Sequence, residues 1–272
     1  MPPRKGSHVT KAFTDGPSNG DGTVGKALDV LDMVANADGP VRFTDLLAGS
    51  PYPKATLYRF LQTLTHQNML SYDADRQTYA LGMRLVRLAH TAWAQSSLAP
   101  LARPHLDRLS AALGETIHLA QLDQGQVLYV DKRNAAQPVD MFSSAGKVGP
   151  AYCTGVGKAM MAYLPADALE QALHRQSFYQ FTPHTYANRD ELLAELAAIR
   201  ARGYAFDREE HEPNIICVAA PILSERGRAI GAISVTSTKL RTSLEQLEDL
   251  APQILATAAD IATEARNWRF PE

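Results

Sequence analysis

The 272-residue sequence predicts an α+β protein built from two unlike parts. Two observations indicate this class. Residues before about 82 show three helical patterns and then two short extended runs, whereas residues after about 98 alternate strand-like and helical patterns. We therefore expect a flexible tail over residues 1–21, a small domain over 22–82, a linker helix over 83–97, and a larger domain over 98–270 with an antiparallel sheet and flanking helices.

The composition is that of an ordinary globular protein. Hydrophobic residues make up 45% of the chain and charged residues 21%, so a core can form and extensive disorder is not expected. No run of about 18 apolar residues occurs, and the N-terminus lacks the apolar segment of a secretory signal, which predicts a cytoplasmic protein without a membrane partner. The two cysteines, Cys153 and Cys217, are too few for a disulfide framework or a four-cysteine zinc site, so no metal or other cofactor is expected.

The small domain has the pattern of a winged helix-turn-helix. Thr44 is expected to cap the second helix, and Pro53 opens the third at a position where a missing N–H costs nothing. Two extended runs around a polar turn predict a β-hairpin, the wing. The helices are expected near residues 24–38, 45–48 and 53–68, and the hairpin strands near residues 70–72 and 78–81.

The third helix carries a polar face opposite its apolar stripe. Lys54, Thr56, Tyr58 and Arg59 on this face can contact phosphates or base edges, and Arg76 in the hairpin turn can contact the DNA backbone. The net charge of −2 does not by itself identify a nucleic-acid binder. Because a small helical domain presents a polar face to water in any case, periodicity alone leaves DNA binding and a solvated face as equal alternatives.

The rest of the chain predicts a linker helix, an antiparallel sheet and further helices. Trp93 lies on the apolar face of the linker helix, so this face packs against either a second copy of the chain or its own domain. Asn188 and Thr242 each precede a glutamate by three residues, the capping-box pattern that opens a helix. Helices are expected near residues 83–95, 98–113, 155–164, 167–174, 189–202 and from 243 onward, and strands near residues 115–122, 126–133, 139–143, 204–207, 215–221 and 229–238.

A glycine-rich helix start in the larger domain predicts an anion site. The first N–H groups of a helix lack internal partners and carry partial positive charge, so the amides of Gly155, Val156 and Gly157 suit a carboxylate or phosphate. The spacing matches neither a Walker A loop nor a dinucleotide fingerprint, and a tight turn that needs small residues explains the same glycines. Ser234 and Thr236 share one face of a predicted strand, which is either solvated or lines a polar cavity.

Cys153 beside this helix start allows a second, enzymatic interpretation. A helix N-terminus favours a thiolate, and His118, His184 or His211 could serve as the base of a cysteine nucleophile. No cysteine-hydrolase signature surrounds Cys153, so a buried, inert cysteine is the favoured interpretation. The spacing of Cys153, Cys217 and His211 matches no zinc motif.

Three segments in a fixed order resemble the IclR-type (isocitrate lyase regulator type) family of bacterial transcription regulators. They are residues 53–64 (PKATLYRFLQTL), residues 154–165 (TGVGKAMMAYLP), and residues 203–211 (GYAFDREEH) continuing into 217–222 and 231–236. The resemblance extends over about residues 22–266. It implies a winged-helix domain, a linker helix and a GAF-like effector domain, assembled as a homodimer or homotetramer, and it implies no catalysis.

The resemblance also implies an effector site. In family members that hold small carboxylates, the ligand-contacting positions match Gly155, Val156, Asp207, Cys217, Ser234 and Thr236. Together these observations predict a DNA-binding transcription regulator, a repressor, that binds double-stranded operator DNA and is controlled by a small organic acid or sugar acid. The alternatives are a cysteine-dependent enzyme that uses Cys153 and a sensor whose first domain binds protein instead of DNA.

Overall fold

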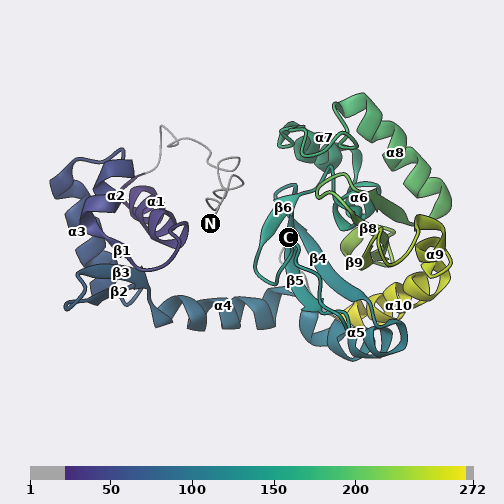
Figure 1. Ribbon diagram of the computed structural model, residues 1–272, viewed down its shortest axis with the longest axis horizontal. Coiled ribbons are helices and arrows are strands. Elements are labelled where there is room, and N and C mark those ends of the chain that lie inside the picture. The colour runs from purple at the N-terminus through teal and green to yellow at the C-terminus, as the bar shows by residue number, and fades with distance from the viewer. Residues whose placement is uncertain (1–21, 268–272) are drawn as a thin grey trace, which may run out of the picture. The chain divides into compact units, whose positions relative to one another are not determined.

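The computed structural model describes residues 22–267, and the chain divides into two units between Thr91 and Ala92 (Figure 1). The expected tail over residues 1–21 and the last residues of the expected second domain lie outside the described range. Both units mix helices with antiparallel strands, which confirms the predicted α+β class. In the described range, no helix is long and apolar enough to cross a bilayer.

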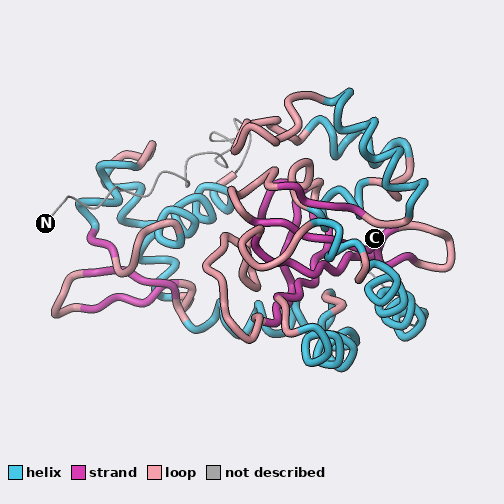
Figure 2. Tube along the Cα trace, turned by 45° about the vertical axis from the view of Figure 1, so that its right-hand side comes forward, coloured by secondary structure: helices cyan, strands magenta, loops and turns pink. Residues whose placement is uncertain are grey.

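The first unit is a helix-turn-helix with a three-stranded sheet in the order β1-β3-β2. Its core includes Leu57, Phe60, Leu61 and Leu64, the apolar stripe of the third helix. The β2–β3 hairpin projects as the expected wing (Figure 2). The elements are α1 (Thr23–Ala35), β1 (Val41–Arg42), α2 (Phe43–Gly49), α3 (Lys54–His66), β2 (Leu70–Asp73) and β3 (Thr78–Leu81).

Strand β1 corrects the expected start of the second helix. Val41 and Arg42 pair with Tyr79 and Thr78 of β3, so the main chain is extended up to Arg42, the residue that precedes α2. Thr44 therefore lies inside the helix and does not cap it; its hydroxyl donates to the neighbouring Asp45 carboxylate at 3.3 Å. A two-residue edge strand has no alternation, so the sequence pattern could not reveal it.

The second unit contains one six-stranded antiparallel sheet in the order β6-β5-β4-β9-β8-β7. Helix α4 (Met83–Ser96) begins in the first unit and ends in the second. One apolar core joins one face of the sheet to α5, α9 and α10, and another joins the opposite face to α6, α7 and α8. The strands are β4 (Thr116–Asp123), β5 (Gln126–Arg133), β6 (Val148–Pro150), β7 (Ala205–Arg208), β8 (Ile215–Leu223) and β9 (Ala229–Thr238). The helices are α5 (Ala99–Leu113), α6 (Gly155–Met161), α7 (Ala166–His174), α8 (Arg189–Arg202), α9 (Leu244–Glu248) and α10 (Ala251–Glu264), followed by a 3₁₀ turn, η1 (Ala265–Asn267).

The expected strand over residues 139–143 is wrong, and β6 takes the sheet edge instead. The main chain of this segment is hydrogen-bonded to side chains, and not to a neighbouring strand. The Phe142 N–H donates to the Glu212 carboxylate at 3.0 Å, and the Ser143 carbonyl accepts from Lys132 Nζ at 2.8 Å. The segment is therefore a loop.

Capping confirms one helix start and corrects another. The Asn188 side chain accepts from the Glu191 N–H at 3.0 Å, as expected. The last helical region begins one residue after the expected cap: Ser243, not Thr242, forms a capping box with Gln246. That region is also broken into α9 and α10, because Pro252 has no N–H with which to continue the first helix.

Candidate effector cavity and DNA-contacting surface

The register of four neighbouring strands gathers polar side chains on one face of the large sheet. Thr236 of β9 pairs with Cys217 of β8, which in turn pairs with Asp207 of β7. On the other side of β9, Ser234 pairs with His118 of β4. Because side chains alternate along a strand, the residues between these positions belong to the apolar core on the opposite face.

These polar side chains line a small, partly open cavity with about 30 Å³ of free space. All six expected effector residues lie around it: Gly155, Val156, Asp207, Cys217, Ser234 and Thr236. Ser234 and Thr236 are only 3% and 5% exposed, which excludes the alternative of a solvated strand face. Met141, which the sequence offered as a pocket-wall residue, lines the cavity as well. The sequence prediction did not place the remaining lining residues in an effector site: His118, Tyr129, Ser143, Thr154, His211, Glu212 and Ile215.

His118 is the centre of the hydrogen-bond network in this cavity. Its Nδ1 lies 3.2 Å from both Ser234 Oγ and Thr236 Oγ1, and its Nε2 lies 2.7 Å from Ser143 Oγ. Burial, with a smaller contribution from the charge of Lys132, lowers the pKa of His118 to about 3, so the ring is neutral at physiological pH. His118 shares a face of the sheet with Ser234 because the two residues are paired. The sequence could have predicted this only if the pairing of β4 with β9 were known.

The buried surroundings of Asp207 favour the protonated form of its carboxyl group. Burial and then the neighbouring Glu210 raise the pKa of Asp207 to about 8, against the opposing effect of Lys158. Its Oδ1 accepts from the Glu210 N–H at 2.9 Å. Among the described residues Oδ2 has no partner, so the carboxyl group can donate a hydrogen bond to a ligand.

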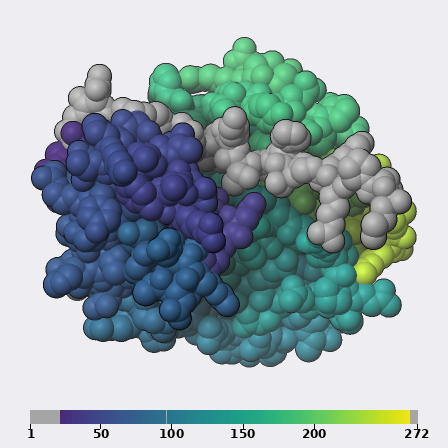
Figure 3. All heavy atoms as spheres, turned by 60° about the vertical axis from the view of Figure 1, so that its left-hand side comes forward, coloured from purple at the N-terminus to yellow at the C-terminus, as the bar shows by residue number. Residues whose placement is uncertain are grey.

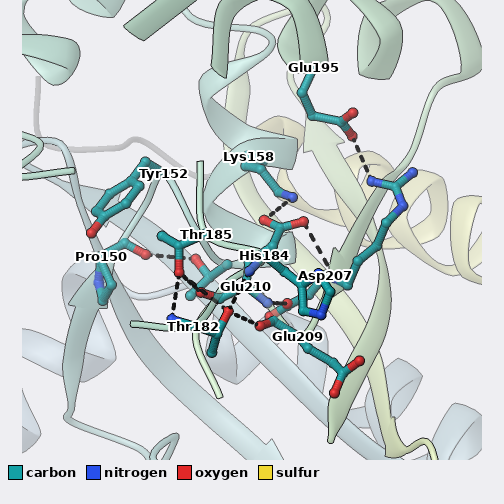
Figure 4. A network of polar contacts seen from close by, with 12 residues as sticks. Pro150, Tyr152, Lys158, Thr182, His184, Thr185, Glu195, Asp207, Glu209 and Glu210 are labelled. Carbon is teal, nitrogen blue, oxygen red and sulfur yellow. Dashed lines mark hydrogen bonds and ion pairs between the residues drawn. The ribbon is translucent and has the colours of Figure 1, made fainter. Parts of the chain in front are cut away.

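A buried ion pair lies beside Asp207. The Lys158 ammonium points at the Glu210 carboxylate and forms a short ion pair with it (Figure 4). The two residues are 0% and 1% exposed. The Tyr186 ring lies 4.8 Å from the ammonium, and the Thr185 hydroxyl donates to the Glu210 carbonyl at 2.6 Å. The pair thus fixes the segment that follows Asp207.

The two glycines at the start of α6 serve different purposes. A Cβ on Gly155 would lie 2.4 Å from Cys217 Sγ, and a Cβ on Gly157 would lie 2.3 Å from the Ala151 carbonyl oxygen. Gly157 is therefore needed for close packing, as the tight-turn interpretation holds. In the described part of the chain, no acceptor takes the N–H of Gly155 or Val156, and both residues line the cavity.

Cys153 is fully buried, which bears out the interpretation of an inert cysteine and not that of a thiolate nucleophile. Burial and the nearby Asp207 and Glu210 carboxyl groups raise the pKa of the Cys153 thiol well above its usual range. Within the described residues, none of His118, His184 or His211 forms a hydrogen bond with it, and no group of three His, Cys, Asp or Glu side chains could hold a metal ion. Cys153 is a core residue.

The expected DNA-contacting residues lie on the surface of the first unit, whose atoms are the purple and blue spheres of Figure 3. Lys54, Tyr58, Arg59 and Arg76 are exposed, whereas Thr56 is half-buried. Lys54 and Tyr58 also line a groove of about 700 Å³ between the start of α3, the start of α2 and the hairpin. Arg42, which the sequence prediction missed, lies in the same groove.

An exposed cationic helix-turn-helix surface in one unit and a small polar cavity in the other define a ligand-controlled DNA-binding regulator. Comparison with known proteins agrees with this class. The family model described as IclR helix-turn-helix domain matches residues 23–74, and the model described as bacterial transcriptional regulator IclR C-terminal matches residues 90–263.

The similarity to individual proteins extends over most of the chain. An uncharacterized HTH-type transcriptional regulator of Escherichia coli strain K12, RhmR, is 32% identical over 90% of this chain and 94% of its own length. The transcriptional repressor IclR of the same strain is 26% identical over 87% of both chains. The crystal structure of a transcriptional regulator from Rhodococcus sp. RHA1, RHA06195, superposes with a TM-score of 0.76 at 29% identity and covers 89% of this chain and 97% of its own.

The chain belongs to the IclR family of transcriptional regulators. It is a DNA-binding regulator with an effector-binding C-terminal domain, and its family consists of transcription regulators and not of enzymes. The interpretation of Cys153 as a nucleophile is therefore overturned.

Proposed function

We propose that the protein is a repressor whose effector is a small carboxylate bound in the cavity around His118. The observation that carries this proposal is the convergence of neutral hydrogen-bond donors on one small cavity. The Gly155 and Val156 amides, the Ser143, Ser234 and Thr236 hydroxyls and the protonated Asp207 all face it. Gly155, Val156, Asp207, Cys217, Ser234 and Thr236 then form the effector site.

The polarity of the cavity favours an anion that accepts hydrogen bonds. His118 is uncharged, so its Nε2 or Nδ1 can accept from one hydroxyl and donate to another. A hydroxyl that accepts from the imidazole N–H keeps its own proton and can donate it to a ligand oxygen. A ligand that only donates, such as an ammonium ion, would leave the two amides without partners, at a cost of about 1–3 kcal/mol for each buried group.

The size of the cavity implies that the effector is small and that the wall moves. About 30 Å³ of free space holds one or two water molecules and no organic acid. Met141 and Ser143 come from the loop that replaces the expected strand, so this loop is the wall that can give way. An organic acid or sugar acid with a few carbon atoms is the ligand class that we propose.

A thermal-shift screen tests the effector proposal. Small organic acids and sugar acids are compared with their amides, each against the wild type and S234A. We expect a subset of acids to raise the melting temperature of the wild type, since a ligand that binds only the folded state stabilises it. The amides and the variant should respond weakly. Equal responses to acids and amides, or an unchanged response in S234A, would contradict the proposed site.

For the first unit we propose that Lys54, Thr56, Tyr58 and Arg59 contact the operator in the major groove and that Arg76 contacts its backbone. A homodimer or homotetramer would place two such units on a two-fold operator. The relationship to the transcriptional repressor IclR supports repression. Fluorescence anisotropy with the DNA upstream of the gene should show sequence-selective, salt-dependent binding; a first unit that binds a protein partner would show neither.

A further inference from the structure

We propose that a β-bulge at Val130 couples the effector cavity to helix α4, with Trp93 as the residue that senses it. The inference rests on the proposed function, because it takes the cavity as the effector site. It names the route by which occupancy of that cavity reaches the helix that enters the first unit.

The bulge lies in strand β5, beside the cavity. Along β4, Leu119 pairs with Asp131 and the next residue, Ala120, pairs with Tyr129, so Val130 has no partner in the ladder. Such an extra residue disrupts the ladder locally and changes the local twist. The role of hydrogen-bond donor to the Val130 carbonyl must therefore be filled from outside the β4–β5 pairing.

Trp93 of α4 supplies that role. Its indole Nε1–H donates to the Val130 carbonyl oxygen at 3.1 Å. The Arg103 guanidinium lies over the indole ring at 4.8 Å and 3.7 Å from the Asp131 carboxylate, on the residue that follows the bulge. The C-terminal part of α4 is thus held by the bulge and by the residue next to it.

The other side of the bulge reaches the cavity through Tyr129. The Tyr129 side chain lines the cavity and its ring packs edge-on against His118, with 5.4 Å between ring centres. Its main chain is bonded to the loop that forms the movable wall: the Tyr129 N–H donates to the Lys147 carbonyl at 3.0 Å, and the Gly146 N–H donates to the Tyr129 carbonyl at 2.8 Å.

The same loop places Ser143 on His118. Ser143 Oγ lies 2.7 Å from His118 Nε2, at the position where a ligand oxygen would compete for the imidazole. A ligand that displaces Ser143 must shift the loop, and the loop carries both main-chain partners of Tyr129. The ladder on either side of the bulge fixes the register of β5, but the bulge itself is not fixed in this way. The main chain at Val130 can therefore move with the loop, and Trp93, which is bonded to the Val130 carbonyl, moves with it.

Hydrogen exchange tests the coupling without DNA and without an organic acid. In W93F the aromatic ring remains and the N–H donor is lost. We expect exchange to accelerate about fivefold, the factor that corresponds to one hydrogen bond, in peptides covering residues 126–133 and 139–150. Peptides from β8, residues 215–223, should keep the wild-type rate. The matched control is Y204F, which removes the 2.6 Å bond between Tyr204 and Glu248 at the far side of the same unit and should leave residues 126–150 unchanged.

The reciprocal variant completes the test, since coupling between two sites acts in both directions. In S143A, with Trp268 replaced by phenylalanine so that Trp93 is the single tryptophan, we expect the Trp93 emission maximum to shift. Unchanged exchange over residues 139–150 in W93F, acceleration that also includes residues 215–223, or an unchanged emission in S143A would each overturn the coupling. None of these results depends on the ligand screen, so the effector proposal and the coupling can fail separately.

Discussion

Polar residues are used in opposite ways in the two units. In the second unit, Lys158 is fully buried and its charge is matched by Glu210. In the first unit, Lys54 is exposed on the start of α3, and no side chain of the described chain forms an ion pair with it. A buried polar group must find its partners within the chain, whereas an exposed one stays available for another molecule. The cavity residues should therefore be essential for stability, and the groove residues only for DNA binding.

The largest effect should come from breaking the buried ion pair. We expect K158M to lower the free energy of unfolding by about 3–5 kcal/mol, because it leaves the Glu210 carboxylate buried without its partner. The double variant K158M/E210L should recover much of this loss, since two apolar side chains leave no uncompensated charge. Urea unfolding measures both.

The control for this variant is an exposed ion pair in the same unit. Arg189 and Glu170 are 2.5 Å apart, with side chains 46% and 45% exposed. R189M should hardly change the unfolding midpoint, because water screens such pairs. Equal losses of unfolding free energy in K158M and R189M would show that burial does not distinguish the Lys158–Glu210 pair from the Arg189–Glu170 pair.

The next largest effect should come from a single methyl group at the cavity edge. In G155A the new Cβ would lie 2.4 Å from Cys217 Sγ, so α6 must shift against β8. We expect a loss of about 1–3 kcal/mol in the free energy of unfolding, as for other overpacked sites, together with the loss of any organic-acid response. G49A is the control, since no atom lies within 4 Å of a Cβ at Gly49. If G155A unfolds like the wild type, the packing of α6 on β8 is looser than the contacts indicate.

The exposed groove, with Lys54, and the adjoining exposed face of α3, with Arg59, should behave in the opposite way to the cavity. We expect K54A and R59A each to weaken DNA binding about tenfold and to reduce the slope of log affinity against log salt by about one, while the melting temperature stays at the wild-type value. Anisotropy titrations at several salt concentrations measure the slope. A large drop in the melting temperature of either variant would contradict the division between cavity and groove residues.

The helices and much of the candidate site could be predicted from the sequence, because the patterns that indicate them lie within short segments. Helical periodicity located α3 and its exposed face, and the family resemblance supplied all six lining residues expected for the cavity. Residues whose role depends on pairing were missed. His118 becomes a cavity residue only through its register with Ser234, and Ser143 only because a loop, held by Glu212 and Lys132, replaces the expected strand. The helix start left a thiolate at Cys153 open as an alternative, because helix position is local. Burial, which raises the pKa of the Cys153 thiol, comes from the tertiary fold and supports the favoured interpretation of an inert cysteine.

The smallest effect is a pH dependence specific to the cavity. Burial raises the pKa of Asp207 to about 8 in the folded protein, above its ordinary value of 3.8, so the folded state holds a proton that the unfolded state releases. Stability from this group is therefore greatest at low pH and is lost as the pH rises to about 8. Between pH 7 and pH 8 the loss should be about 1 kcal/mol. D207N has no such proton. Between pH 7 and pH 8 the urea midpoint of the wild type should therefore fall relative to that of D207N. If the urea midpoint of the wild type instead fell relative to that of D207N on acidification, Asp207 would be ionised in the folded protein and could not donate to a carboxylate.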